Sequence, residues 1–162
     1  MNRMRIVRTL ALAAATAIAM TGVALAADTT NPFLGTWVLN VAKSTFDPSP
    51  PLKSNTLTIT DAGNGAVHEV IDYVERDGSA THMELTTALD GKEVPVTGGG
   101  EADAVIATQP DPRTVKYVFT KAGKWVETGR FTLSKSGKTL HGPLHGKDAQ
   151  GAWKYHYVYE RQ

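Results

Sequence analysis

The chain of 162 residues contains no cysteine. Structural disulfides, thiol catalysis and Cys-ligated zinc are therefore excluded, and so is lipid attachment at a cysteine following a leader. A composition of 41% hydrophobic and 20% charged residues is ordinary for a globular protein, so global disorder is not indicated. We expect a domain that is stabilised by one hydrophobic core alone.

Catalytic signatures are also lacking. The sequence has no Gly-x-Ser-x-Gly elbow, no His-Glu-x-x-His and no phosphate-binding loop. Carboxylates at Asp72, Glu75, Glu84 and Glu127 lie at polar positions of alternating segments, and although any pair could meet across a barrel, we expect them to be solvated. The sequence predicts a protein that is not an enzyme.

An excess of charge is absent as well, since the formal net charge is only +1. Part of the basic content, Arg3, Arg5 and Arg8, precedes an apolar run from Thr9 to about Met20 and the small residues at 24–26. This order is typical of a secretory signal peptide cleaved after Ala26, and the run is too short for a membrane anchor. We predict a leader over 1–26 and one domain over 27–162, periplasmic or secreted, without affinity for nucleic acid.

Five histidines are too dispersed to indicate a metal or haem site. His141 and His145 are separated by roughly 13 Å in an extended strand, too far to share one ion. His156 falls on the polar side of its alternating segment. We expect surface histidines, with no metal and no cofactor.

No window after the leader shows an apolar stripe at helical spacing. Alternation is clear instead: Trp153, Tyr155, Tyr157 and Tyr159 share one face of a final strand. Turn signals such as Asn64-Gly65 separate the runs. The expected strands lie near residues 34–41, 54–61, 66–76, 81–89, 92–97, 103–109, 113–121, 124–134, 138–145 and 152–161.

Depending on how many neighbouring strands merge, the prediction is an all-β protein of 8–10 strands. Hairpins at this spacing remove their exposed edges most simply by closing into an antiparallel up-and-down β-barrel, and less simply by forming a sandwich. The Pro-rich segment 46–52 would be a stiff connection between the first two strands, either a lid over the barrel or a plain crossover.

Several stretches carry a resemblance to a known family. They are Gly35-Thr36-Trp37 with Asn40-Val41-Ala42-Lys43-Ser44, Asp90-Gly91-Lys92 with Val94-Pro95-Val96-Thr97-Gly98, Arg113-Thr114-Val115, Ser134-Lys135-Ser136-Gly137-Lys138-Thr139-Leu140, and Tyr159-Glu160-Arg161. In this order they resemble the lipocalin-like, calycin-type β-barrels, and specifically a group of uncharacterised exported bacterial proteins with a lipocalin-like domain.

The resemblance implies that Arg161 lies across the indole of Trp37, next to Gly35, and joins the first and last strands. A Thr-Asp-Tyr motif of central lipocalins is missing, because Asp72-Tyr73 lies too early in the chain. The resemblance therefore supports a barrel more firmly than it supports ligand carriage.

The aromatic face of the last strands is the best candidate for a binding wall. Rings with polar tips suit a small hydrophobic molecule with one or two hydrogen-bonding groups, but the same rings could simply fill a small barrel. A bulge at Gly129 or Gly142 could also turn a strand locally. The candidate cavity-lining residues are Trp153, Tyr155, Tyr157, Tyr117, Phe119 and Phe131.

Two functions remain open. The first is an exported protein that binds a small hydrophobic ligand inside the barrel. The alternative is a protein-binding module, such as an exported inhibitor, in which the barrel is filled and the loops at 46–52 and 98–103 make the contact.

Overall fold

The computed structural model describes residues 31–48, 52–149 and 151–162. The expected leader over 1–26 lies outside the described residues, as does the centre of the Pro-rich connection at 49–51. The described part of the chain contains no helix with the length and apolar character needed to cross a membrane.

The described residues form eleven strands and one short 3-10 helix, η1 (Val41–Lys43). The strands are β1 (Gly35–Leu39), β2 (Thr45–Asp47), β3 (Ser54–Gly63), β4 (Ala66–Val74), β5 (Ala80–Thr87), β6 (Asp90–Gly98), β7 (Ala104–Asp111), β8 (Thr114–Lys121), β9 (Lys124–Leu133), β10 (Thr139–Asp148) and β11 (Gly151–Arg161).

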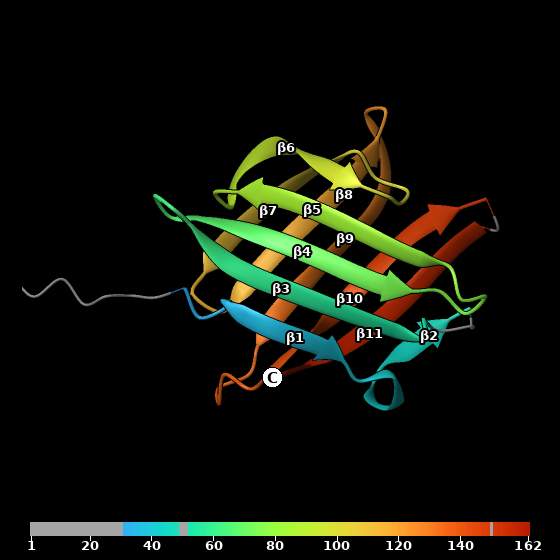
Figure 1. Ribbon diagram of the computed structural model, residues 1–162, viewed down its shortest axis with the longest axis horizontal. Coiled ribbons are helices and arrows are strands. Elements are labelled where there is room, and N and C mark those ends of the chain that lie inside the picture. The colour runs from blue at the N-terminus through green and yellow to red at the C-terminus, as the bar shows by residue number, and fades with distance from the viewer. Residues whose placement is uncertain (1–30, 49–51, 150) are drawn as a thin grey trace, which may run out of the picture.

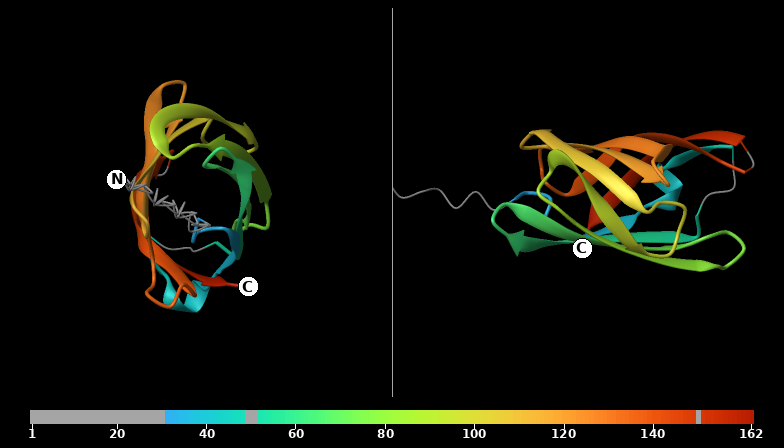
Figure 2. Two further views of the ribbon diagram at one scale, coloured as in Figure 1. Left: turned by 90° about the vertical axis from the view of Figure 1, so that its left-hand side faces the viewer. Right: turned by 90° about the horizontal axis from the view of Figure 1, so that it is seen from above.

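From β3 to β11 each strand pairs antiparallel with the next along the chain, and β1 pairs with both β3 and β11. This last pairing closes the sheet into a cylinder, which Figure 2 shows end-on (Figures 1 and 2). Full closure leaves the long strands with a partner on both sides, as the abundance of tight hairpin turns predicts. The predicted all-β, up-and-down antiparallel barrel is confirmed, with ten long strands and the short β2.

The first strand of the barrel is interrupted, which the sequence did not predict. β1 and β2 both lie along β11, pairing with its residues 159–161 and 154–156 respectively, and η1 loops out between them. The side chain of Asn40 caps this helix by accepting a hydrogen bond from the Lys43 amide at 3.1 Å. The Ser44 hydroxyl accepts from the Val158 amide at 3.0 Å, so the ladder along β11 continues through a side chain.

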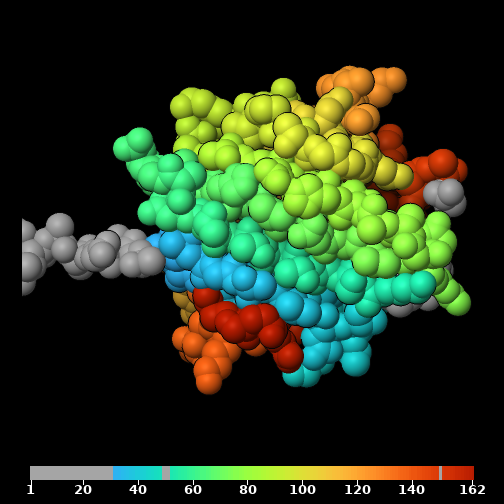
Figure 3. All heavy atoms as spheres, in the orientation of Figure 1, coloured from blue at the N-terminus to red at the C-terminus, as the bar shows by residue number. Residues whose placement is uncertain are grey.

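β1 and the end of β11 therefore form a seam between the two ends of the chain. Figure 3 shows the red C-terminal strand directly against the blue first strand. Trp37 pairs with Arg161 across the seam and Leu39 with Tyr159. The end of the barrel at this seam, which also carries the turns at 64–65 and 134–138, is called the Trp37 end below.

A β-bulge sets the facing of Trp125. Strict alternation along β9 would place Trp125 on the same face as Phe131 and Leu133, but the register of β8 and β9 shifts between Phe119 and Thr120. Trp125 is consequently on the outside, 36% exposed, with its ring 5.9 Å from that of His145. No register shift occurs at Gly129 or Gly142, so the rest of β9 and β10 keep the predicted facing.

Candidate functional site

The Trp37 end is plugged by a cluster of buried and hydrogen-bonded side chains. The indole of Trp37 is fully buried and donates from Nε1 to the Phe33 carbonyl at 2.8 Å. The guanidinium of Arg161 lies over this ring, with Cζ 4.1 Å from its centroid. The arginine also donates to the carbonyls of Pro32, Leu34 and Gly137. This contact, worth roughly 0.5–2 kcal/mol as a cation–π pair alone, fixes the first strand to the last.

Gly35 makes room for the arginine. A Cβ at this position would lie 2.7 Å from Nη1 of Arg161, and the backbone has φ +129°, which side chains rarely adopt. Gly35, Trp37 and Arg161 are thus in mutual contact and have a structural role.

Beyond the plug the barrel encloses a cavity of about 470 Å³. Its lining comes from both the long strands and the loops at the end opposite Trp37, where Glu101 and Asp148 are exposed to solvent. A volume of this size accommodates a small organic molecule. The interior is therefore not filled by side chains. All six candidate residues line the cavity: Trp153, Tyr155, Tyr157, Tyr117, Phe119 and Phe131.

The aromatic residues form one continuous wall. On β11 the rings of Trp153 and Tyr155 stack with centroids 4.6 Å apart, and Tyr155 and Tyr157 stack at 5.9 Å. On the neighbouring side Tyr117 stacks on Phe131 at 5.8 Å. Rings held by stacking on one another lose little freedom when a ligand arrives, so the wall is preorganised.

Two glycines let these rings lie flat against the sheet. A Cβ at Gly129 would lie 2.4 Å from the Tyr117 oxygen, and a Cβ at Gly146 would lie 2.4 Å from Cζ2 of Trp153. Because both positions lack a side chain, the rings occupy that space and the cavity keeps its width.

Two carboxylates point into this interior. Glu127 accepts a hydrogen bond of 2.8 Å from the Tyr117 hydroxyl, and Glu69 lies on β4 between the apolar Val67 and Ile71 of the same face. Burial raises the pKa of Glu69 to about 7. Burial also raises the pKa of Glu127 to about 7, against the opposing effect of the Tyr117 hydrogen bond. At neutral pH each carboxyl is close to half ionised.

The solvated state expected for Glu127 is thus wrong. Glu127 pairs with Phe119 in the β8–β9 ladder and faces inward as Phe119 does. The bulge lies between this pair and the Thr120–Trp125 pair, so it does not change the facing of Glu127. Asp72 and Glu84 are on the outside as expected, where both bond to His82 at 2.6 and 2.8 Å. Glu69 was missed, although its parity with Val67, Ile71 and Tyr73 carried the signal.

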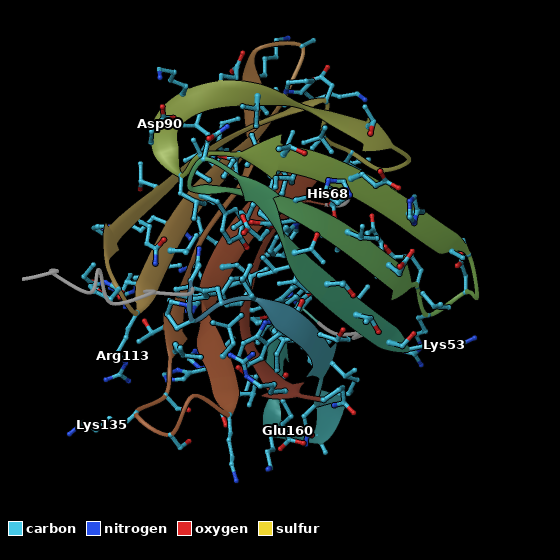
Figure 4. The ribbon with its side chains drawn as sticks, turned by 60° about the vertical axis from the view of Figure 1, so that its left-hand side comes forward. Lys53, His68, Asp90, Arg113, Lys135 and Glu160 are labelled. Atoms are coloured by element: carbon cyan, nitrogen blue, oxygen red, sulfur yellow. The ribbon has the colours of Figure 1, made fainter. Side chains whose placement is uncertain are left out.

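Three further acids line the cavity near its opening: Glu75, Glu101 and Asp148. The described lining contains no lysine, arginine or histidine, and residues 49–51 and 150 are Ser, Pro and Gln. Basic residues close to the barrel ends, such as Lys53, Arg113 and Lys135, point away from the interior (Figure 4). The cavity is apolar in its walls and acidic in its charged groups.

Asn55 adds a neutral acceptor. This β3 side chain is 5% exposed and lines the cavity, yet its Oδ1 has no hydrogen-bond partner among the described residues. Leaving a buried amide oxygen unpaired costs about 1–3 kcal/mol. A donor group on a bound molecule would satisfy it.

The histidines considered as metal ligands are absent from the lining. His141 and His156 lie with their rings 5.9 Å apart on strands where the inward positions are held by Leu140, Tyr155 and Tyr157. Within the described ranges no group of three or more His, Asp or Glu side chains is arranged to hold a metal ion.

Comparisons with solved structures identify the class of fold. No protein-family model matches the chain, and no curated protein matches its sequence. The fluorescent protein UnaG is 16% identical with a TM-score of 0.52, over 80% of this chain and 97% of its own. The fatty-acid-binding protein 1 of Echinococcus granulosus is 15% identical with a TM-score of 0.52, over 82% and 98%.

The zebrafish ileal bile-acid-binding protein, solved with cholic acid, is 13% identical with a TM-score of 0.50, over 81% of this chain and 99% of its own. These neighbours are calycin-type β-barrels, and the chain shares their fold. At such identities the likeness concerns the fold alone.

Proposed function

We propose that the chain is an exported, non-enzymatic carrier that binds a small hydrophobic molecule inside its barrel. The observation that carries the proposal is the cavity of about 470 Å³ with its preorganised aromatic wall. Two structural neighbours are named for fatty-acid and bile-acid binding, which supports a barrel interior as the place where a hydrophobic ligand is held.

Export is supported by the leader-like residues 1–26, which would deliver the domain to the periplasm or beyond. A binding role rather than catalysis is supported by the sequence, which offers no nucleophile-and-base motif.

The test is to purify the protein, extract it with organic solvent and identify any released molecule by mass spectrometry. The uncharged dye Nile red then measures binding directly by its fluorescence. Thr81 faces the cavity, so Thr81→Trp would fill part of the volume and weaken dye binding by about ten-fold. The control is Ala80→Trp on the same strand, which places the same ring on the exposed outer side.

Circular dichroism establishes that both variants keep their strands. Absence of any extracted molecule together with absence of saturable dye binding would refute the carrier function. Equal dye binding by the two variants would place the dye outside the barrel.

The alternative, a module that binds a protein through its loops, depended on a filled interior. The cavity removes that argument in its favour. Capture of a periplasmic protein, lost on alanine substitution across 47–52 and 98–103, would nevertheless establish it. Capture that survives those substitutions would exclude these loops as the interface.

A further inference from the structure

We propose that the ligand is a hydrophobic amine, bound as an ammonium cation whose head lies against the carboxylate of Glu127 and whose apolar part extends toward the Trp37 end. This inference rests on the proposed function and specifies the class of molecule that the cavity selects.

The charged groups of the cavity carry one sign. Glu69, Glu75, Glu101 and Glu127 line it, without a basic side chain in the described lining. Charges enclosed by low-dielectric walls, as Glu69 and Glu127 are, act on a bound molecule more strongly than charges in water. An anionic ligand would meet repulsion there, whereas a cation would supply a counter-charge.

The cavity also has an unsatisfied acceptor. Asn55 Oδ1 is buried beside the cavity without a partner among the described residues, and it needs a donor. Asn55 pairs with Tyr73 on the next strand, and the charges of Glu75, Glu101 and Glu127 all act on Tyr73. The lone acceptor and three of the acids therefore belong to the same part of the cavity. An ammonium group carries several N–H donors and no acceptor, which matches this arrangement.

Glu127 is held in place by a side chain of the neighbouring strand. Its Oε1 accepts the Tyr117 hydroxyl at 2.8 Å, and Tyr117 is itself stacked on Phe131 and seated over Gly129. The carboxylate is thus oriented before a ligand arrives, which lowers the ordering cost of binding. Deeper in the barrel Leu57, Ile59 and Leu140 line the cavity and suit the apolar part of the ligand, beside Glu69, whose raised pKa favours its neutral form.

The inference separates this chain from neighbours of the same fold. Fatty acids and cholic acid are carboxylic acids, and a site for their anions needs cationic or hydrogen-bond-donating partners. This cavity presents carboxylates instead. Shared fold with opposite charge selectivity is expected when function is determined by side chains placed on a common scaffold.

A pH dependence follows. The titratable groups around Glu127 are Glu101 in the loop before β7 and five tyrosines: Tyr73 on β4, Tyr117 on β8, and Tyr155, Tyr157 and Tyr159 on β11. Burial raises the pKa of all five tyrosines, so they stay neutral near pH 7. Because the pKa of Glu127 is about 7, a cation that binds the ionised form will release up to about half a proton at this pH.

The experiment compares dodecylamine, dodecanol and dodecanoate below their micelle concentrations, by calorimetry near pH 7 in two buffers that differ in ionisation enthalpy. We expect the amine to bind at least about ten-fold more tightly than the carboxylate, as for a charge-assisted hydrogen bond. Amine binding should release up to about half a proton, which alcohol binding does not.

Glu127→Gln should remove about ten-fold of the amine affinity together with the proton release, and should change dodecanol affinity by a much smaller factor. The matched control is Glu93→Gln, an exposed acid on β6 that does not line the cavity. Glu127→Gln keeps the shape of the side chain, and Tyr117→Phe, which frees the carboxylate without removing it, provides a second variant with a smaller expected loss.

The outcomes distinguish this inference from the proposed function. If none of the three probes binds, the carrier function itself fails. If dodecanoate binds as tightly as dodecylamine, the carrier function stands and the amine inference is overturned. Loss of amine selectivity in Glu69→Gln but not in Glu127→Gln would overturn the assignment of the head group to Glu127.

Discussion

The hydroxyl of Tyr117 donates to Oε1 of Glu127 at 2.8 Å inside the barrel, from adjacent strands β8 and β9. This bond favours the ionised carboxylate and offsets part of the effect of burial on its pKa. Tyr117→Phe should therefore raise the pKa of Glu127 above about 7. Carbon-13 NMR titration of the glutamate side-chain carboxyls measures it, and Tyr155→Phe, which removes a cavity hydroxyl elsewhere, is the control.

Gly129→Ala should have the same effect without substituting either partner, because the added Cβ would lie 2.4 Å from the Tyr117 oxygen and displace the hydroxyl. An unchanged Glu127 titration in both variants would contradict the role assigned to this bond.

The buried acids predict how stability depends on pH. The unfolded chain releases the protons of Glu69 and Glu127 near pH 4.5, whereas the folded chain keeps them to about pH 7. The folded state thus binds more protons across this window, and its stability falls as pH rises through it, by on the order of 2 kcal/mol for each group given their partial contact with the cavity. Urea unfolding between these limits measures the slope.

Glu69→Gln and Glu127→Gln should each flatten that slope. His82 also makes stability fall as pH rises, over a window above the ordinary pKa of histidine. Its bonds to Asp72 and Glu84 raise its pKa, and the stability they contribute is lost as pH rises through the raised value. His82→Asn therefore serves to separate the two sources. A slope that stays the same in both glutamine variants would show that the acids titrate normally.

Two glycines with nearly equal φ angles allow the contribution of the Arg161 contact to stability to be measured. Gly35 has φ +129° and Gly151 has φ +130°, but only at Gly35 would a Cβ meet another group, Nη1 of Arg161 at 2.7 Å. Both alanine variants should lose stability through backbone strain, on the order of 1–3 kcal/mol. Gly35→Ala should lose at least about 1 kcal/mol more, because it displaces hydrogen bonds from a charged group. Equal losses in urea unfolding would show that Arg161 adapts freely.

The three tryptophans occupy different environments and offer a readout of ligand position. Trp37 is buried in the plug, Trp153 lines the cavity and Trp125 lies outside under the ammonium of Lys147, 5.7 Å from its ring centroid. Binding of dodecanol should change the fluorescence of Trp153 alone, so Trp153→Phe should abolish the signal and Trp125→Phe should preserve it. A signal lost in Trp125→Phe would indicate binding on the outer face.

Local patterns were sufficient to predict much of this barrel. Alternation of Trp153, Tyr155 and Tyr157 placed β11 and its inward rings, and tight turns such as Asn64-Gly65 placed the hairpins. The features that the sequence did not predict depend on longer-range geometry. The bulge that turns Trp125 outward arises from how β8 and β9 pair, and the break between β1 and β2 arises because Asn40 and Ser44 bond locally and to β11.

The site was only half predictable for a related reason. Aromatic residues indicate their burial by their own hydrophobicity, whereas Glu69 and Glu127 are charged types that are seldom buried. Their facing follows from the ladder, in which Glu69 pairs with Ile59 and Leu85, and Glu127 with Phe119. At these two residues a charged side chain occupies an inward-facing position, and such conflicts are common where a protein binds its ligand.

The seam has a consequence for how the chain reaches its native state. Arg161 bonds to Leu34 across 127 positions and Val158 to Ser44 across 114, so the cylinder closes only through contacts that are distant in sequence. A chain in which β1 and β11 are not paired is an open ribbon of hairpins with two free edges, which is the form most exposed to aggregation. Removal of residues 159–161, which pair with β1, would open the cylinder at the seam while the hairpins from β3 to β9 keep their partners.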